Sequence, residues 1–407
     1  MTLFRKTAKQ LRDLIKVRMY RPSHLRLGLR DFFDLRLPTT AIYDNSIHLR
    51  AAMDWLCRAQ DATPDGGVAA RYRFSLGWSA SYPETTGYII PTFFDYADLS
   101  NDETFHRRAV RMADWLLSVQ FNSGAFPAHD ASAEREPRVF NTGQAMRGLW
   151  RAFRETGNEI YLEACRRAGD WLVSVQEADG AWRKWEYHQR AHAYHTEVAW
   201  PLLRLFAVTS CARYREAAVK NLDWVLSCQQ PNGWFAQCGF KDDTAPYLHT
   251  IAYTINGLLE SGALLQPQSP DQNVYVRAAL LASEALLHRY EVRRFMPGQF
   301  DRHWKGTVNY SCLTGNVQTT INWLRLYEFT QDARLLNGAL KLNDFVKSTQ
   351  DLQSRHPGIL GGIKGSHPIW GRYIHFGYPN WAAKYFADAM IIEDKIVQAL
   401  YRREGLA

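Results

Sequence analysis

The chain lacks several features that mark common protein classes. Its apolar runs are short and interrupted by polar residues, which argues against a membrane-spanning helix. The N-terminus shows no apolar stretch followed by a small-residue cleavage site, so no secretory signal is predicted. No Gly-rich phosphate loop or nucleotide signature is present, and we expect no cofactor. None of the six cysteines forms a CxxC pair, which indicates buried thiols in a reducing compartment and a cytoplasmic protein.

Positive charge is concentrated near the N-terminus. Residues 1–37 contain ten lysines and arginines and three aspartates, so they carry +7 of the net +8 of the whole chain. Apolar residues such as Leu11, Leu14 and Ile15 lie among these cations, a pattern typical of helices that bind an anionic membrane surface. A basic helix packed on the outside of a folded domain would show the same pattern. The aromatic residues do not interleave with the charge, so no nucleic-acid partner is predicted.

One helical motif recurs along the chain. The segments DWLCRAQ, DWLLSVQ, DWLVSVQ and DWVLSCQ end at Gln60, Gln120, Gln176 and Gln229, which are 60, 56 and 53 residues apart. A Gly-rich turn follows each of them, and a weaker copy ends at Gln350. A further copy without the glutamine lies between the last two. A period of this length is typical of repeats that each form one helical hairpin.

A second set of helices alternates with the first. Each is expected to begin at a polar N-cap, whose side chain accepts a bond from a first-turn N–H. The expected caps are Thr86, Thr142, Thr196, Thr250, Thr314 and Asn380. The residues that follow are apolar on nearly all sides, as in TEVAWPLLRLFA, which is typical of helices in an interior. The first set carries charged residues and suits an outer layer.

Six outer and six inner helices predict an all-α fold, an (α/α)6 toroid of six helical hairpins. A closed ring buries both sides of every inner helix, whereas an open solenoid needs capping repeats at its ends. We expect the toroid to span residues 45–392. A basic amphipathic helical extension over residues 1–44 precedes it, and a tail over residues 393–407 follows it.

The repeat resembles the QW motif of squalene–hopene-type terpene cyclases. The third copy matches that motif through Arg167, Ala168, Trp171, Leu172, Gln176, Gly180 and Trp182. The resemblance implies a toroid, with the glutamine bonded to free carbonyls at a helix end. The segment KDDTA at 241–245 is similar to the acid motif DxDDTA of the same cyclases, but Phe240 stands at its first Asp. A terpene cyclase-like enzyme is therefore retained only as an alternative.

Several phrases resemble uncharacterised bacterial proteins associated with surface-polysaccharide assembly, related to uronyl C5-epimerases and polysaccharide lyases. They are SYPETTGYIIPT, LTGNVQ, GGIKGSHPIWGRY and YPNWAAKYFADA. This resemblance implies an enzyme of polysaccharide biosynthesis whose substrate is an acidic, uronate-containing polysaccharide or lipid-linked glycan.

The loops that lead from each outer helix to the next inner helix are long, aromatic and polar. They span residues 61–85, 121–141, 177–195, 230–249, 291–313 and 351–379. The loops on the opposite rim are short. Long loops on a rigid scaffold usually carry function, so we expect the site at the long-loop rim.

The residue types of these loops suit a sugar acid, because aromatic rings stack on a pyranose and cations bind its carboxylate. Removal of the C5 proton needs a base and a group that neutralises the carboxylate. The candidates for catalysis are Tyr194, His195, His249, Tyr310, Glu197, Glu84 and Asp301. The candidates for substrate binding are Arg190, His188, Trp185, Trp234, Asp242, His303, Lys364, Trp370, Arg372 and Asn380.

Histidines are prominent among these candidates. His195 and His249 hold the same position in adjacent hairpins, and we expect them to lie side by side at the rim. His188, His192 and His195 have the spacing of a metal cluster on a helix. They fall in a loop, so no metal site is predicted.

Besides the terpene cyclase-like alternative, three functions from different classes remain open at this point. The first is an epimerase or lyase that abstracts the C5 proton of a uronate. The second is a glycoside hydrolase, which would pair Glu84 or Glu197 with Asp242 or Asp301 across the mouth. The third is a glycan-binding scaffold without catalytic activity, which would have aromatic side chains at the mouth but no titratable pair.

Overall fold

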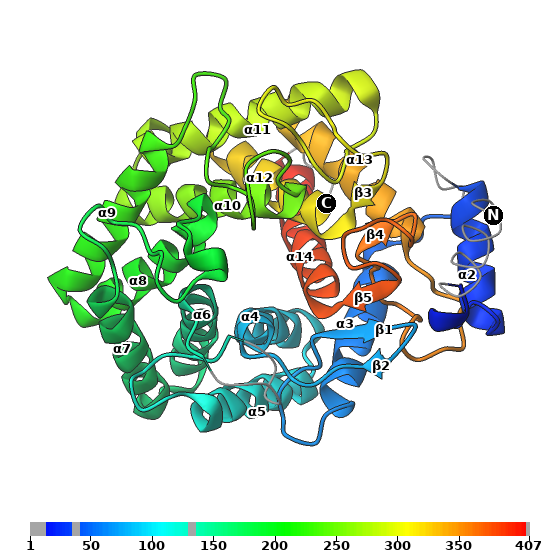
Figure 1. Cartoon of the computed structure of the whole chain (residues 1–407), viewed down its shortest axis with the longest axis horizontal. Helices are drawn as coiled ribbons and strands as arrows, with labels where there is room; N and C mark the ends of the chain where they lie inside the picture. The colour runs from blue at the N-terminus through cyan, green and yellow to red at the C-terminus, as the bar shows by residue number, and fades with distance from the viewer. Residues whose placement is uncertain (1–13, 35–40, 129–135, 404–407) are drawn as a thin grey trace, which may run out of the picture.

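The computed structural model describes residues 14–34, 41–128 and 136–403, and in these residues two concentric rings of helices are formed (Figure 1). The inner ring consists of α4 (Pro83–Ser100), α6 (Val139–Thr156), α8 (Thr196–Thr209), α10 (Leu248–Leu265), α12 (Leu313–Thr330) and α14 (Asn380–Arg403). The outer ring consists of α3 (Asn45–Asp61), α5 (Glu103–Val119), α7 (Glu159–Ser174), α9 (Ala212–Ser227), α11 (Val274–Arg293) and α13 (Ala333–Thr349). Each inner helix packs against the next one in order, and α14 packs against both α4 and α3 to close the ring. The predicted (α/α)6 toroid is confirmed.

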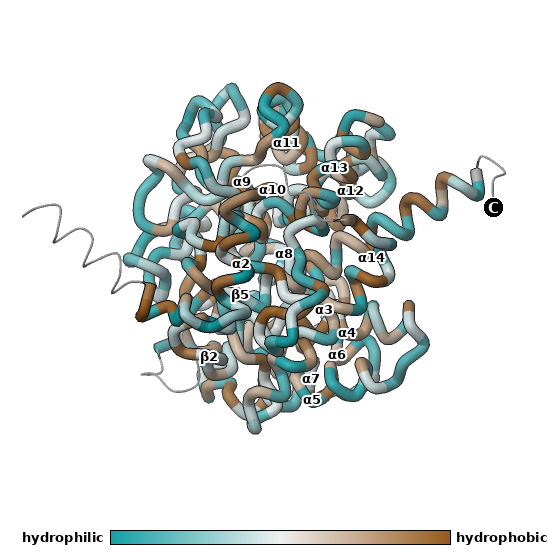
Figure 2. Tube along the Cα trace, turned by 90° about the vertical axis from the view of Figure 1, so that its right-hand side faces the viewer, coloured by the Kyte–Doolittle hydropathy of each residue, from teal (hydrophilic) through white to brown (hydrophobic). Residues whose placement is uncertain are grey.

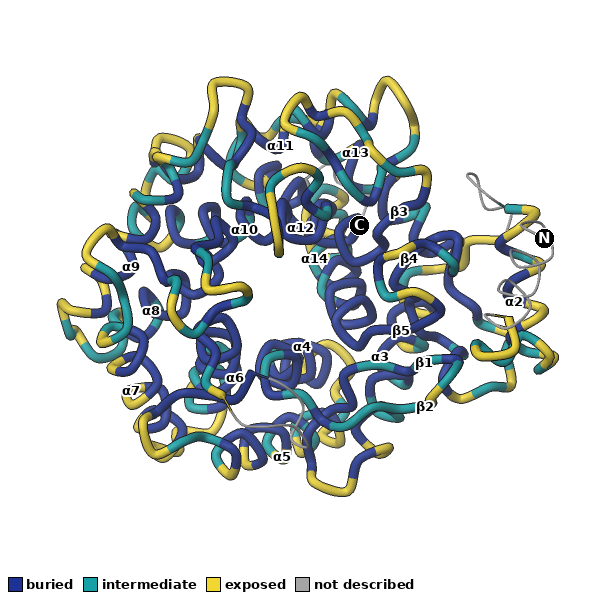
Figure 3. The backbone as a smooth tube through the Cα atoms, in the orientation of Figure 1, coloured by how far each residue is buried: buried dark blue, intermediate teal, exposed yellow. Residues whose placement is uncertain are grey.

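The two rings differ in burial as the sequence predicts. Inner helices such as α12 are buried along almost their whole length, whereas the outer helices bury one side and expose the other (Figure 3). The apolar sequences of the inner helices fit a position between two layers of neighbours. The outer helices are amphipathic because they face solvent.

The repeated glutamines join neighbouring hairpins. Gln120 Nε2 donates to the carbonyl of Gly124 in the following turn and to the carbonyl of Ala164 in α7, both at 2.9 Å. The same pair of bonds recurs at Gln60, Gln176 and Gln229. Gln350 closes the circle by donating to the carbonyl of His48 in α3 at 3.2 Å. The glutamine thus satisfies carbonyls in its own turn and in the adjacent outer helix.

The glycines of these turns allow close contact with the next hairpin. Gly124 has a φ of +93°, and a Cβ there would lie 2.1 Å from the carbonyl oxygen of Arg167. Gly180 repeats this geometry against the carbonyl of Lys220. A larger residue at either position would push two outer helices apart.

The threonines predicted as N-caps lie inside the helices, so that prediction is wrong in its detail. Helix α4 begins at Pro83 and α6 at Val139, three residues before Thr86 and Thr142. Thr86 Oγ1 accepts from the backbone N–H of Val68 at 3.0 Å, and Thr142 Oγ1 accepts from Phe126 N–H at the same distance. These buried hydroxyls fix the preceding long loop against the helix.

Short strands order the long-loop rim. Strands β1 (Arg71–Arg73), β2 (Gly77–Trp78) and β5 (Gly377–Pro379) form an antiparallel sheet in the order β2-β1-β5. Strands β3 (Ser311–Cys312) and β4 (Ser366–His367) form a second pair. Short 3-10 turns lie at Tyr187–Gln189, Ala193–His195 and Pro270–Gln272. The first sheet joins the first and last long loops, and so completes the rim where the chain closes on itself.

Helix α2 (Pro22–Phe33) lies on the outer flank of the ring (Figure 2). Its buried Asp31 pairs with Lys364, and its Asp34 carbonyl lies 2.9 Å from His367 Nε2. Residues 1–13 and 35–40 of the expected extension, and residues 404–407 of the expected tail, lie outside the described residues. Helix α14 continues past residue 392 to Arg403. In the described part of the chain, no helix is long and apolar enough to cross a membrane.

Candidate functional site

A cavity of about 770 Å³ opens at the long-loop rim, and we name it the mouth cavity. The first turns of several inner helices form its walls, together with β1, β2 and the long loops. Its polar and titratable lining consists of Arg71, Arg73, Ser79, Tyr82, Glu84, Tyr187, His188, Tyr194, Lys241, His249, Tyr253 and Tyr373. This cavity lies at the same rim at which the sequence predicts the site.

Glu84 lies in the first turn of α4 and faces this cavity. Tyr82 Oη donates to Glu84 Oε2 at 2.6 Å and lies 3.3 Å from Tyr187 Oη. Burial raises the pKa of Glu84 to about 7, and the bond from Tyr82 only partly opposes this effect. A carboxyl group with such a pKa exchanges a proton at neutral pH and can act as a general acid.

His249 lies in the first turn of α10. Its Nδ1 is 2.8 Å from Gln318 Oε1, and because that oxygen can only accept, Nδ1 carries the proton. Nε2 is therefore the basic atom of the ring. Burial lowers the pKa of His249 to about 4, so the imidazole is neutral at neutral pH. The ring packs against Tyr253 and Tyr373, with centroid distances of 4.4 and 5.5 Å.

Cations and aromatic rings complete the lining. Arg71 and Arg73 flank the buried Tyr72 in β1, so that both arginines line the cavity, and Lys241 lies on another wall. Among the described lining residues, Glu84 is the single carboxylate that faces these cations. Trp78 and Trp381 add flat apolar surfaces. Such a lining suits a sugar ring that carries an acid group.

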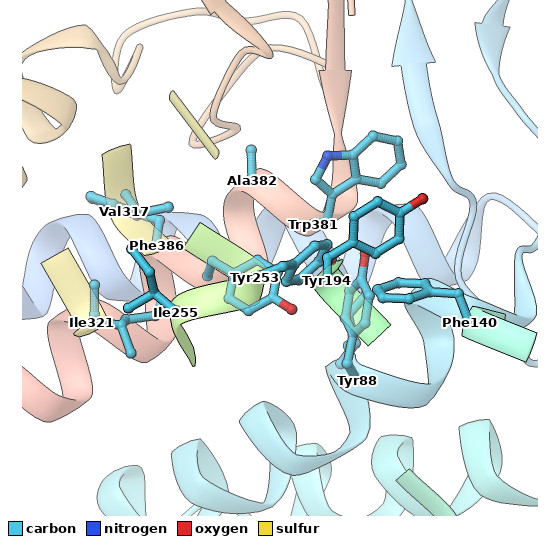
Figure 4. Packing of buried hydrophobic residues seen from close by; sticks show 14 of the residues in the cluster. Tyr88, Phe140, Tyr194, Tyr253, Ile255, Val317, Ile321, Trp381, Ala382 and Phe386 are labelled. Atoms are coloured by element: carbon cyan, nitrogen blue, oxygen red, sulfur yellow. The ribbon is translucent and has the colours of Figure 1, made fainter. Parts of the chain in front are cut away.

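Tyrosines form the floor of the mouth cavity. Tyr194 and Tyr253 line the cavity there, and Tyr88 packs near them together with Phe140 and Trp381 (Figure 4). Tyr385 of α14 lies below them, and its ring centroid is 5.5 Å from Tyr88 and 5.9 Å from Tyr253. The hydroxyl groups of Tyr194, Tyr253 and Tyr385 are buried without a hydrogen-bond partner among the described residues.

A second cavity of about 440 Å³ lies beneath this floor, between the inner helices, and we name it the rear cavity. Glu197, a predicted catalytic residue, faces the rear cavity. Burial raises the pKa of Glu197 to about 7, although Arg147 lies 3.5 Å away. Glu84 and Glu197 therefore face different cavities, and neither serves as the partner of the other.

The structure separates the two histidines that were expected to lie together. His249 reaches the mouth cavity, whereas His195 is fully buried with its Nε2 3.4 Å from Glu186 Oε1. A 3-10 turn over Ala193–His195 directs Tyr194 into the cavity in place of His195. Each ring nitrogen of His192 faces a backbone carbonyl at 3.1 Å. No group of three metal-ligating side chains occurs among the described residues.

Four other candidates pack inside the protein. Tyr310 lies against Cys312 and Tyr373 behind the cavity wall. Trp234 packs edge-on against Trp304 at 5.1 Å. Asn380 donates to the carbonyl of Ala69 at 3.0 Å, and Lys364 binds Asp31 of α2. These contacts hold the rim together, and none of the four side chains lines the mouth cavity.

The remaining candidates lie around the rim, outside the cavity lining. Asp242 accepts from the N–H of Thr244, and Asp301 accepts from the N–H of His303, so that both carboxylates close turns at 2.9 Å. Arg190 bonds to Gln237, whereas His303 and Arg372 are exposed. Trp185 and Trp370 are half-buried and pack against the core. Of the candidates chosen from the sequence, Glu84, His188, Tyr194 and His249 meet in the mouth cavity.

Sequence reasoning missed the arginine pair in the mouth cavity. The alternation of Arg71, Tyr72 and Arg73 is the period of a strand with one buried side, and this signal could have identified both arginines. Tyr253 and Trp381 were missed because they lie within inner-helix sequences that read as core.

The fold is shared with several sugar-processing enzymes of known structure. A sugar epimerase from a ruminal bacterium superposes with a TM-score of 0.70 at 11% identity, over 86% of this chain and 97% of that chain. An unsaturated glucuronyl hydrolase specific for heparin gives a TM-score of 0.69 at 14% identity, over 86% and 97%. A cellobiose 2-epimerase from Bacillus thermoamylovorans B4167 gives 0.67 at 14% identity, over 86% and 98%. This chain is an α/α toroid of the same type.

No protein-family model matches the chain, and no curated protein matches it by sequence. At identities of 14% and below, these structural similarities show the fold alone.

Proposed function

We propose that this protein is a carbohydrate-active enzyme that removes the C5 proton of a uronate residue in an acidic glycan, as an epimerase or a lyase. The observation that carries the proposal is the lining of the mouth cavity. It combines His249, held neutral as a base, with Glu84, whose pKa is about 7, and with cations that suit a carboxylate. An acid, a base and a carboxylate site are the groups that this chemistry needs.

The roles follow from the geometry. His249 Nε2 takes the C5 proton, while Arg71 and Arg73 bind the carboxylate and stabilise the negative charge that develops on it. Glu84 is the acid. In a lyase it protonates the oxygen that leaves C4, which yields a C4–C5 double bond. In an epimerase a proton returns to C5 from the opposite face, and Glu84 and Tyr194 are the candidate donors.

The structural neighbours support the class of enzyme. Their names include sugar epimerases and glucuronyl hydrolases, so toroids of this shape hold sites for sugars and for sugar acids. A role in polysaccharide biosynthesis remains part of the proposal and rests on the sequence resemblance.

A glycoside hydrolase is the second candidate, and the raised pKa of Glu84 favours it, because a protonated carboxyl group can protonate a leaving sugar. Hydrolysis also needs a group that activates water or attacks the sugar. Asp242 and Asp301 close turns of the rim and Glu197 faces the rear cavity. The described lining therefore favours proton abstraction, with His249 as the base.

Product analysis separates these reactions. The protein is incubated with oligosaccharides that contain glucuronate or iduronate, and the products are followed by NMR and by ultraviolet absorbance. Inversion at C5 identifies an epimerase, and a rise in absorbance from an unsaturated uronate identifies a lyase. Either activity should be lost in His249→Asn and kept in Glu216→Gln, a substitution on the exposed side of α9. New reducing ends without unsaturation would overturn the proposal in favour of a hydrolase, and unchanged substrates would favour a glycan-binding scaffold.

We also propose that α2 places the protein on an anionic membrane surface. Its outward side exposes Leu25, Leu29, Phe32 and Phe33, with Phe33 79% exposed. Arg26 of the same helix is exposed, as is Lys16 before it. Large exposed apolar residues among cations are typical of helices that insert into the headgroup region. The opposite side of α2, with Leu27 and Asp31, is buried against the ring.

Vesicle flotation tests this location. The protein should float with vesicles that contain phosphatidylglycerol and stay behind with purely zwitterionic vesicles. The double change Phe32→Ser and Phe33→Ser should abolish flotation. Ile160→Ser removes a comparably exposed apolar residue from α7, far from α2, and should have no effect. Equal flotation of the two variants would contradict the proposal.

A further inference from the structure

The rear cavity is lined by charged residues that the reaction proposed for the mouth cavity does not use. It lies between α4, α6, α8, α10, α12 and α14, on the far side of the tyrosine floor. Four arginines line it, namely Arg147, Arg151, Arg204 and Arg325. Buried arginines are normally matched by carboxylates or by a bound anion.

Two of these four arginines are already neutralised. Arg151 lies 2.8 Å from Asp95, and Arg325 lies 2.8 Å from Glu260. Two other acids of the lining are also paired, Asp388 with Lys384 at 2.5 Å and Glu328 with Arg325. Of the other cations in the lining, Arg204 and Lys395 have no ion pair among the described residues, and Arg147 has only Glu197, at 3.5 Å.

Arg204 is held in place by aromatic rings. Its guanidinium carbon lies 4.5 Å from the ring centroid of Trp150 and 4.9 Å from that of Trp200. It makes no hydrogen bond or ion pair with any described residue. Burial lowers the pKa of Arg204 to about 10, so it remains charged at neutral pH. A stacked guanidinium keeps its edge free for an oxyanion.

Arg147 lies beside it in the same arrangement. Its guanidinium carbon is 4.3 Å from the Trp200 ring centroid, and its Nη1 has no hydrogen-bond partner. Arg147 forms an ion pair with Glu197, with Nη1 3.5 Å from Oε2. Burial raises the pKa of Glu197 to about 7, so near neutral pH a large fraction of it carries a proton and can donate to an anion.

Unpartnered donors are gathered around this cavity. The indole N–H groups of Trp150 and Trp200 and the Nε2 amide of Gln318 are buried without a hydrogen-bond partner among the described residues, as is Arg147 Nη1. Gln318 is 3% exposed and Glu197 is 1% exposed. Leaving so many buried donors unpaired is unfavourable unless a ligand with several acceptor oxygens satisfies them.

We infer that the rear cavity is a second ligand site, which binds a small oxyanion through Arg147, Arg204 and the donors of Trp150, Trp200 and Gln318. The ligand chemistry is that of a phosphate, a sulfate or a sugar carboxylate. Gln318 also holds His249 through its other amide atom, so a bound oxyanion fixes the orientation of the mouth imidazole. That link rests on the proposed function, whereas the binding itself does not.

Calorimetric titration at constant ionic strength tests the site. Inorganic phosphate and glucuronate are titrated separately into the protein. Saturable binding of phosphate alone assigns a phosphate-type ligand. Saturable binding of glucuronate assigns a carboxylate only where Arg204→Gln weakens it, because glucuronate can also bind at the mouth arginines. Arg204→Gln should weaken this binding at least tenfold. Arg213→Gln, on the exposed side of α9, should leave both titrations unchanged, and Arg73→Gln in the mouth cavity should leave the phosphate titration unchanged.

The result that would overturn the inference is a lack of saturable binding, or binding that is lost in Arg73→Gln and kept in Arg204→Gln. A second measurement uses the unaltered protein, so it does not depend on the folding of a variant. The indole N–H signals of Trp150 and Trp200 should shift in NMR spectra with the same saturation as the calorimetric signal. Signals that stay fixed during the titration would contradict the site. Oxyanion binding to the rear cavity can be confirmed or refuted by these measurements whether or not the mouth cavity processes a uronate.

Discussion

Gln318 Oε1 lies 2.8 Å from His249 Nδ1, so one amide side chain connects the rear cavity to the imidazole of the mouth cavity. This bond fixes the tautomer of His249 and leaves Nε2 as the base. It also raises the pKa of the ring, against the larger effect of burial. Gln318 acts as a positioning residue in this arrangement, because it orients a group that touches the substrate.

Gln318→Leu should reduce kcat about 10- to 100-fold with a smaller change in KM, because the imidazole loses the bond that selects its tautomer. The pKa of His249 should fall further, since the bond that raises it is gone. Imidazole nitrogen chemical shifts measured by NMR should show one tautomer in the unaltered protein and a mixture in the variant. Gln331→Leu, at the C-terminal end of α12, is the control. A variant with reduced activity and an unchanged tautomer would show that Gln318 acts in another way.

The pH dependence of kcat/KM should be bell-shaped. His249 must be neutral to act as a base, so activity is lost as the pH falls through about 4. Glu84 must be protonated to act as an acid, so activity is lost as the pH rises through about 7. Glu84→Gln should remove most of the activity, and what remains should lack the alkaline limb. A profile that keeps rising above pH 8 would show that Glu84 is not the acid.

The glutamines of the repeat should matter for stability. Gln176 donates to the carbonyls of Gly180 and Ala217, and Gln176→Ala would leave both oxygens without this donor. We expect a loss of about 2–3 kcal/mol in the free energy of unfolding. Urea denaturation measures it, with Gln272→Ala, an exposed change, as the control. If both variants lose the same amount, the repeated bonds contribute nothing specific.

The attachment of α2 depends on Asp31 and Lys364. Burial alone would raise the pKa of Asp31, but the charge and hydrogen bond of Lys364, together with His367 and Arg30, outweigh it, and the pKa lies below its ordinary value. Lys364→Met would leave a buried carboxylate without this partner and should cost about 3–5 kcal/mol. Urea denaturation measures this loss of stability, and limited proteolysis near residue 34 measures the release of α2. The double variant Asp31→Asn, Lys364→Met should regain part of the stability, and equal stability of the single variant and the unaltered protein would refute the role.

The ring could be predicted because it depends on local patterns that repeat. The glutamines mark the end of each outer helix, and the apolar helices that alternate with them fit only an inner layer. The sequence places the threonines in the inner helices correctly, but their predicted role as N-caps is wrong. Thr86 bonds to Val68, which lies in the preceding loop, and the helix itself begins earlier, at Pro83.

The site could be predicted only in part because loop geometry decides which side chain faces the cavity. Tyr194 and His195 are adjacent in sequence, yet a 3-10 turn sends Tyr194 into the mouth and His195 toward Glu186. Lys364 is predicted to bind a substrate carboxylate; it does bind a carboxylate, but the partner is Asp31, which is 333 residues away in the sequence. A contact between such distant residues cannot be derived from local spacing.

Deuterium exchange at C5 tests the central claim most directly. A uronate-containing oligosaccharide is incubated with the protein in D2O, and the substrate and product are examined by NMR and mass spectrometry. For an epimerase, we predict deuterium at C5 of the recovered or inverted uronate. For a lyase, which ends in an unsaturated sugar, we predict that a substrate labelled with deuterium at C5 loses the label. Neither exchange nor loss should occur with His249→Asn. Turnover of the glycan with full retention of the original C5 hydrogen would contradict the account.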